Sequence, residues 1–319
     1  MSHAHDHHGH GHGHGHGHHG HHHHGDPSSR GFALAVVLNV GFVAVELTYG
    51  LLSSSMALVA DAAHNLGDVA GIGLAWAATV VARSRPTPRR TYGLRKATVL
   101  AALANAMLLL LTVGAVAVEA VQRLWEPQAV PGLTLVVVAA VGVVINGVSA
   151  LAFMPRHEHD HDVNRRGAFL HLAADAAVSL AVVVAGAAMM MVSDWWWLDP
   201  VTGLLVSAVV LMTTWSLLRE ALGQALDAVP GHVDAEAVRR FLEGQAGVED
   251  VHDLHIWPLG STEVALTVHL VIPEGRQDPG LLAALSGGLR EGFGIGHCTI
   301  QVETPETRDD CARALQGCG

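Results

Sequence analysis

The sequence has 319 residues, of which 50% are hydrophobic and 15% charged, and its formal net charge is −11. This composition, with a positive mean hydropathy, excludes an ordinary soluble enzyme and requires much of the chain to lie in lipid. The charge also argues against a nucleic-acid-binding protein, because binding of phosphate backbones needs clustered Lys and Arg that this sequence lacks outside its loops.

The first 25 residues contain fourteen of the 24 histidines, interleaved with glycine. This segment has no apolar core of the kind found in a signal peptide, and it cannot bury enough surface to fold. We therefore expect a disordered, His-rich cytoplasmic tail over residues 1–29, whose imidazoles buffer or capture metal ions. A cloning tag is the alternative, but the irregular spacing, with Ala4 and Asp6 inserted, favours a native segment.

Six later segments reach the length of about 20 mostly apolar residues that a helix needs to cross a bilayer. They are Phe32–Leu52, Met56–Val81, Ala97–Val121, Leu133–Met154, Ala168–Val192 and Leu198–Leu218. We predict an α-helical membrane protein with six transmembrane helices, the transmembrane domain covering residues 30–222.

The distribution of basic residues predicts the orientation of these spans. The loop between the second and third spans carries Arg83, Arg85, Arg89, Arg90, Arg95 and Lys96. The loops at residues 53–55 and 193–194 carry neither Lys nor Arg. By the positive-inside rule, the basic side is cytoplasmic, and an even number of spans then places both termini there. We expect a multi-pass protein of the cell membrane.

Residues 223–319 have the character of a small soluble domain. The patterns predict, in order, a helix Val233–Gln245, strands Val251–Trp257 and Val264–Val271, a helix Leu281–Glu291 and a strand Thr299–Val302. This α-β-β-α-β order suits a small α+β sandwich with helices on one face of a sheet. Cys298, Cys311 and Cys318 are too few for a disulfide framework, which fits a reducing compartment, and the last two thiols are candidates to assist a nearby metal.

Two predicted spans carry the pattern His-x-x-x-Asp, as His64 with Asp68 and as His171 with Asp175. Residues four apart lie on one face of a helix, and ionisable groups at bilayer depth are costly enough to indicate function. Two such faces opposed supply two nitrogens and two oxygens, a set that suits tetrahedral Zn²⁺. We predict a metal transport site; polar pairs that tie helices together are the alternative.

Other polar residues in the spans are weaker candidates. Asp61 precedes His64 by three residues and either orients its imidazole or faces water near the membrane boundary. Five more are predicted to be interhelical hydrogen-bond partners and not ligands: Asn39, Glu46, Asn105, Glu119 and Asn146.

These motifs, together with Thr-Tyr-Gly-Leu-Arg-Lys-Ala-Thr-Val-Leu-Ala-Ala-Leu at 91–103 and Val-His-Asp-Leu-His-Ile-Trp at 251–257, resemble the cation diffusion facilitator family. The similarity covers almost everything after residue 30 and is greatest to the bacterial zinc and cobalt-zinc-cadmium resistance branch. It implies a transport site built from the second and fifth spans, a ferredoxin-like cytoplasmic domain that pairs in a homodimer, and exchange of metal for protons. The histidine at 64 resembles that of zinc-selective members.

The resemblance also implies a second metal site in the cytoplasmic domain. His252, His269 and Glu303 match positions of the family's cytoplasmic zinc ligands, while Gln301 replaces a ligand of some members. Ordinary strand histidines and a solvated carboxylate are the alternative.

Two loops differ in their expected metal binding. The segment 91–103 departs from the common family form, which has His near Arg95 and Glu near Thr98, so we expect no metal site there. The charged loop His157-Glu-His-Asp-His161 is expected to be exposed and to collect metal.

The expected function is export of a divalent cation, with Zn²⁺ favoured, by proton antiport, so the protein is a secondary active transporter and not an enzyme. Protons and metal compete for the same histidines and carboxylates. Any Zn²⁺ in the cytoplasmic domain would be structural or regulatory. A nickel or cobalt exporter of the same architecture and a membrane-anchored metal buffer or sensor are the alternatives. An intramembrane metalloprotease is disfavoured, because neither span carries His-Glu-x-x-His.

Overall fold

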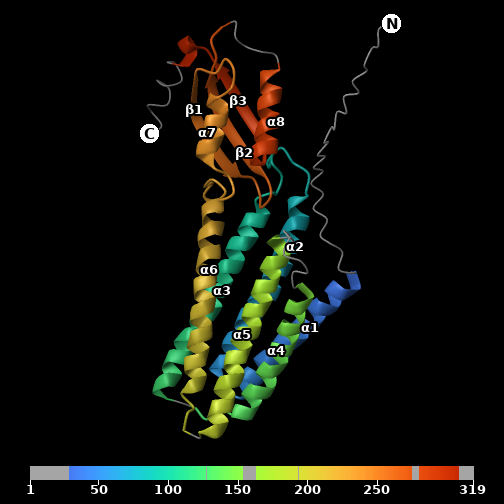
Figure 1. Cartoon of the computed structure of the whole chain (residues 1–319), viewed down its shortest axis with the longest axis vertical. Coiled ribbons are helices and arrows are strands. Elements are labelled where there is room, and N and C mark those ends of the chain that lie inside the picture. The colour runs from blue at the N-terminus through green and yellow to red at the C-terminus, as the bar shows by residue number, and fades with distance from the viewer. Residues whose placement is uncertain (1–28, 127, 154–162, 193, 275–279, 309–319) are drawn as a thin grey trace, which may run out of the picture.

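The computed structural model describes residues 29–126, 128–153, 163–192, 194–274 and 280–308. Long helices form an elongated bundle with a small α/β unit at one end (Figure 1). The bundle consists of α1 Ser29–Leu52, α2 Met56–Ala82, α3 Ala97–Trp125, α4 Gly132–Phe153, α5 Val163–Met191 and α6 Leu198–Ala225. The His-rich residues 1–28, the loop His157–His161, and Cys311 and Cys318 lie outside the described residues.

Five of these helices, α2 to α6, are long and apolar enough to cross a membrane. In α1, the described stretch Asn39–Leu52 is apolar as well. Large apolar side chains on the outside of the bundle, such as Trp76, Leu111 and Val144, are strongly exposed, as lipid-facing residues are. The predicted fold class, a helical membrane region followed by a small α+β domain, is confirmed.

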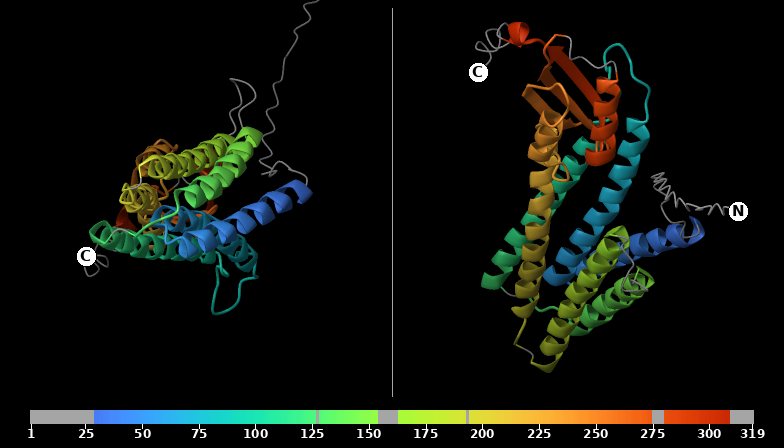
Figure 2. Two further views of the ribbon diagram at one scale, coloured as in Figure 1. Left: turned by 90° about the horizontal axis from the view of Figure 1, so that it is seen from below. Right: turned by 45° about the horizontal axis from the view of Figure 1, so that its top comes forward.

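Helix α2 is central in the bundle, in contact with α1, α3, α5 and α6. Helix α4 packs along α5, and α3 along α6 (Figure 2). Small residues permit the closest approaches: a Cβ at Gly203 of α6 would lie 2.9 Å from the Met56 backbone. Van der Waals packing of this kind holds membrane helices together where the hydrophobic effect does not.

The first turn of α2 is joined to the start of α6 by the buried carboxylate of Asp199. Its Oδ1 accepts from the Ser55 hydroxyl at 2.5 Å, and its Oδ2 accepts from the Met56 N–H at 2.6 Å. Ser55 also caps the helix by accepting from the Leu58 N–H at 3.2 Å. These bonds satisfy N–H groups that a helix start leaves free, and they fix the direction in which α2 presents its side chains.

The small domain contains α7 Ala235–Glu243, β1 Asp250–Pro258, β2 Val264–Val271, α8 Leu281–Phe293 and β3 Ile295–Glu303, in the predicted order. The sheet has the order β1-β2-β3, with β1 antiparallel and β3 parallel to β2. Both helices pack on one side of it, with Val238, Leu242, Leu285 and Leu289 in a shared core.

The last strand begins four residues before its predicted start at Thr299. Gly294 ends α8 with a left-handed φ of 69°, which lets the chain turn directly into β3 at Ile295. Strand propensity at Gly296 and His297 is weak. Parallel pairing with β2 nevertheless starts at Ile295 and, after an irregularity at Gly296, continues from His297. Tertiary pairing therefore overrides the local signal.

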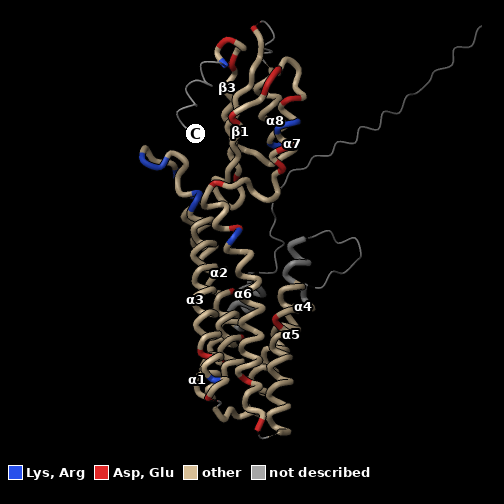
Figure 3. The backbone as a smooth tube through the Cα atoms, turned by 90° about the vertical axis from the view of Figure 1, so that its left-hand side faces the viewer, with Lys and Arg blue, Asp and Glu red and all other residues tan. Residues whose placement is uncertain are grey.

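Lys and Arg gather where the bundle meets the small domain (Figure 3). Arg95 forms an ion pair with Glu263, and Lys96 Nζ lies 2.5 Å from Asp227 Oδ1. The Ser261 N–H donates to Thr98 Oγ1 at 3.0 Å. The segment 91–103, which the sequence marked only by resemblance, thus docks the small domain onto the bundle.

Candidate metal centres

The four predicted membrane ligands meet between α2 and α5. His64 Nε2 lies 3.2 Å from Asp175 Oδ1 and 3.7 Å from Asp68 Oδ2. His171 Nε2 lies 3.2 Å from Asp68 Oδ2 and 3.5 Å from Asp175 Oδ2. Imidazoles and carboxylates therefore alternate around a ring, each histidine touching both aspartates.

These separations suit a small tetrahedral ion. A tetrahedron with metal–ligand distances of about 2.0–2.2 Å has edges of about 3.3–3.6 Å. His64, Asp68 and Asp175 form the tightest group, with ligand atoms all within 4.8 Å of one another. His171 closes the ring from its half-exposed position, where 51% of its side chain is accessible. The site thus has a buried side and an open side.

The position of the ring follows from the helix geometry. His64 lies eight residues into α2, about 12 Å along its axis from Met56. The four-residue spacing in each helix places both ligands of a pair on the same face, toward the other helix. The four described contacts of the ring join only imidazoles to carboxylates, so the two aspartates carry the negative charge that a divalent cation would neutralise.

Both interpretations of Asp61 are wrong. Its side chain is fully buried, and it accepts from Ser179 Oγ at 2.9 Å and from Asn65 Nδ2 at 3.5 Å. It therefore neither faces water nor bonds to His64, whose Nδ1 has no hydrogen-bond partner within the described part of the chain. Periodicity placed Asp61 near His64 but could not show the neighbour on α5.

The other polar residues of the spans have mixed outcomes. Glu46 does bond across helices, since its Oε2 accepts from Asn65 Nδ2 at 3.2 Å. Glu119 instead pairs with Arg123 in its own helix at 3.1 Å, so that prediction was wrong. Three buried amide atoms find no partner among the described residues: Asn39 Oδ1, Asn105 Oδ1 and Asn146 Nδ2.

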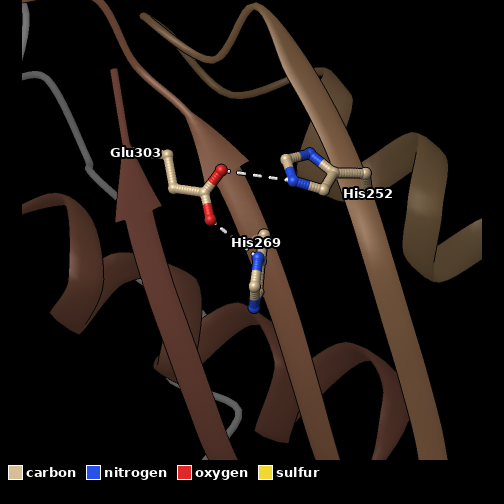
Figure 4. Close-up of side chains that lie close together, drawn as sticks. All are labelled: His252, His269 and Glu303. Atoms are coloured by element: carbon tan, nitrogen blue, oxygen red, sulfur yellow. Dashed lines mark ion pairs between the residues drawn. The ribbon is translucent and has the colours of Figure 1, made fainter. Parts of the chain in front are cut away.

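The three predicted cytoplasmic ligands also meet, on the sheet of the small domain (Figure 4). Glu303 Oε2 lies 3.2 Å from His252 Nε2, and its Oε1 lies 2.7 Å from His269 Nδ1. The strands set this arrangement, because His252 on β1 is paired with His269 on β2, and Glu303 ends β3 beside Val271.

The residues around this second site favour metal binding. Asp253 Oδ2 lies 3.5 Å from His269 Nε2, so a carboxylate orients the ring and leaves Nδ1 directed at Glu303. Gln301 occupies the neighbouring position and donates to Glu303 Oε1 at 2.8 Å. Two imidazoles and a buried carboxylate form three of the four ligands that Zn²⁺ takes, so the residues present fit the ion.

Cys298 is half-buried on β3 and is a free thiol. Burial raises the pKa of this thiol, an effect only partly offset by the positive charge of Arg290. Because the thiolate is the metal-binding form, this shift makes Cys298 a weaker metal ligand than an exposed thiol. The candidate metal ligands in the described part of this domain are therefore histidines and carboxylates.

Comparison with known proteins identifies relatives over both regions. Residues 32–224 match the cation efflux transmembrane domain, and residues 230–305 match the cytoplasmic domain of cation efflux proteins. The zinc transporter ZitB of Pectobacterium atrosepticum is 31% identical, covering 89% of this chain and 88% of the relative. The metal cation efflux system protein CzcD of Cupriavidus metallidurans is 34% identical, covering 86% and 87%.

One solved structure also matches the small domain. The metal-bound C-terminal domain of the CzcD transporter from Cupriavidus metallidurans is 40% identical. The match covers 22% of this chain and 99% of that domain, with a TM-score of 0.21.

Proposed function

This chain belongs to the cation diffusion facilitator family of metal cation efflux proteins, and we propose that its cargo is Zn²⁺ and its driving ion the proton. It is a multi-pass membrane transporter of divalent metal cations. In our proposal it lies in the cell membrane with both termini in the cytoplasm, and it moves Zn²⁺ outward through the ring of His64, Asp68, His171 and Asp175.

The alternating ring of imidazole and carboxylate is the observation that carries this proposal. Its contacts of 3.2–3.7 Å match the edge of a zinc-sized tetrahedron, and its two carboxylates balance the charge of one divalent ion. Zinc has no d-electron preference against such a mixed set of nitrogen and oxygen ligands. The names of the relatives, zinc transporter and metal cation efflux protein, agree with this cargo.

Proton exchange follows from the same four groups. Histidine and aspartate hold a metal only when they are deprotonated, so protons that reach the ring from outside displace Zn²⁺ and reset the site. Its ligands come from two helices in limited contact, α2 and α5. Rocking of helix groups about such a site can open it to either side in turn.

The second site is proposed to be regulatory. Zinc held by His252, His269 and Glu303 would stabilise the arrangement of the small domain that supplies these ligands. The match to the cytoplasmic domain of cation efflux proteins supports pairing of this domain in a homodimer. Metal binding here would then favour one arrangement of the two copies.

The proposal is tested with purified protein in vesicles, by measuring Zn²⁺ flux under an imposed pH gradient. Wild type and a chain lacking residues 1–25 are expected to transport, and His64→Ala is expected to be inactive. Zinc binding without flux in the wild type would instead favour a buffer or sensor. Faster flux of Ni²⁺ or Co²⁺ than of Zn²⁺ would favour the nickel or cobalt exporter.

A further inference from the structure

A pair of acidic residues lies inside the bundle near the metal ring, but its members are not among the proposed ligands. Glu46 of α1 and Asp61 of α2 are both fully buried. One amide, Asn65 Nδ2, donates to both, at 3.2 Å to Glu46 Oε2 and 3.5 Å to Asp61 Oδ1. The two carboxyl groups are also within hydrogen-bonding reach of each other.

No Lys or Arg pairs with Glu46 or Asp61 among the described residues. Helix α4, which packs against α1, has no ionisable residue in its sequence, and the ionisable groups nearest to Asp61 on α2 and α5 are His64 and Asp175, which belong to the metal ring. Two adjacent carboxylates without a cation in an apolar interior cannot both stay ionised. A hydrogen bond between two carboxyl groups likewise requires a proton on one of them.

Glu46 offers a further sign of a missing ligand. Its second oxygen, Oε1, is buried and has no hydrogen-bond partner within the described part of the chain. A buried carboxylate oxygen left without a donor is costly, whereas a protonated oxygen shared with Asp61 is not. The proton is therefore the ligand that this geometry lacks.

The pair is connected to the helix that carries half of the metal ring. Ser179 of α5 donates to Asp61 Oδ2 at 2.9 Å, and it follows Asp175 by four residues, one turn further along the same face. Gly142 of α4 leaves room for this contact, because a Cβ there would lie 3.0 Å from Ser179 Oγ. A shift of α5 against α2 that opens the ring would alter this hydrogen bond as well.

We propose that Glu46 and Asp61 form a proton-binding site, separate from the metal ligands, that takes up and releases one proton in each transport cycle. The step forms and breaks a single O–H bond at a carboxyl oxygen, with water as donor and acceptor of the proton. This inference rests on the proposed function, since an exchanged proton has meaning only in a proton-coupled exporter.

The test measures the steady-state Zn²⁺ gradient that reconstituted protein builds at a series of pH gradients. If the pair carries one of the exchanged protons, Glu46→Gln is expected to lower the Zn²⁺ accumulation ratio by about tenfold per unit of pH gradient, because one proton then no longer contributes. Its Zn²⁺ affinity and its Zn²⁺/Zn²⁺ counterflow, which needs no net proton movement, should match wild type. The matched control is Glu119→Gln, the same change on α3 outside this network, which should behave as wild type.

Several outcomes would overturn the inference. These are an unchanged accumulation ratio in Glu46→Gln, a loss of its Zn²⁺ affinity, or a loss of counterflow in a folded protein. Should Glu46→Gln fail to fold, Asp61→Asn takes its place with the same expectations, and Glu46→Asp should retain coupling.

A spectroscopic measurement separates this idea from the proposed function. Infrared difference spectra of wild type and Glu46→Gln should show a protonated carboxyl band that only the wild type has. If wild type fails to couple Zn²⁺ to protons, the proposed function is wrong, and this band still decides whether the pair holds a proton. Absence of the band overturns the proton site even where transport is normal.

Discussion

The two candidate metal sites use the same kinds of ligand, but helices hold one set and strands hold the other. In the membrane, His64 and Asp68 lie on α2, and His171 and Asp175 lie on α5, two helices in limited contact. In the small domain, His252, His269 and Glu303 lie on three strands joined by a continuous hydrogen-bonded ladder. One set of ligands can separate by helix motion, and the other is fixed by strand register.

The difference extends to access from solvent. In the cytoplasmic site the exposed fraction of the side chains runs from 3% for Glu303 to 26% for His252. In the membrane ring it runs from 7% for Asp175 to 51% for His171, so the ring has the more open side. A transport site must gain and lose its ion in each cycle, so an open, divisible ligand set is an advantage. A regulatory site needs a fixed geometry that the ion can stabilise. The secondary structure that holds the ligands, more than the ligand type, separates the two proposed roles.

The largest expected effect comes from removing a ligand of the membrane ring. Asp175→Ala should lower Zn²⁺ transport by more than the roughly 10–100-fold that loss of an outer hydrogen-bond partner costs a metal site, because Asp175 contacts both histidines. Flux into vesicles measures the effect. Asp194→Ala, an acidic residue in the exposed turn before α6, is the control and should transport normally. Substantial flux in Asp175→Ala would remove the ring from the mechanism.

The stabilisation of the small domain by zinc, measured with and without the metal, should distinguish the second site from the first. Saturating Zn²⁺ at about 100 times its dissociation constant stabilises a folded site by about 2.7 kcal/mol. The zinc-dependent rise in unfolding temperature of the small domain should therefore disappear in His269→Ala and persist in His255→Ala, whose exposed ring bonds only to Asp253 among the described residues. An equal zinc response in the two variants would show that the metal binds elsewhere.

Much of the fold could be predicted because its signals are local. Length and hydropathy identified the membrane helices, and the alternation in Val264–Val271 gave β2 with its observed bounds. The predicted β3 was too short, because the first residues of the strand gain strand structure only from pairing with β2. Local signals therefore failed where a distant partner decides the conformation.

The same distinction holds for the candidate sites. The four-residue spacing made both membrane pairs visible, and the structure opposes them as expected. Asp61 was misjudged because its partner Ser179 lies 118 residues away. No contact between helices was predicted for Asp199, although its carboxylate binds the start of α2. No spacing rule indicates a bond between helices that are distant in sequence.

The bond between α6 and α2 should contribute less than a bound metal. Asp199→Ala removes the acceptor of the Ser55 hydroxyl and of the Met56 N–H, and loss of such a cap typically costs about 0.5–2 kcal/mol. The unfolding temperature in detergent should fall accordingly. Ser207→Ala is a suitable comparison, since its buried hydroxyl has no partner in the described chain, and it should be neutral or slightly stabilising. Equal losses in both variants would mean that Asp199 contributes only packing.

The smallest effect is expected where the two regions meet. Arg95 and Glu263 are 40% and 47% exposed, and solvent-exposed ion pairs contribute about 0.2–1 kcal/mol. Arg95→Gln and Glu263→Gln should therefore lower stability only slightly, and the double variant should lose no more than the larger single loss, because each change already breaks the pair. Glu291→Gln on α8 serves as the exposed control. Salt screens this exposed pair but not the buried contact of Asp175 with His64. The effect should therefore shrink at high ionic strength while the Asp175→Ala defect stays constant. If the double variant instead loses much more than either single one, Arg95 and Glu263 act through different partners, and the small domain is held to the bundle by a wider set of contacts than this pair.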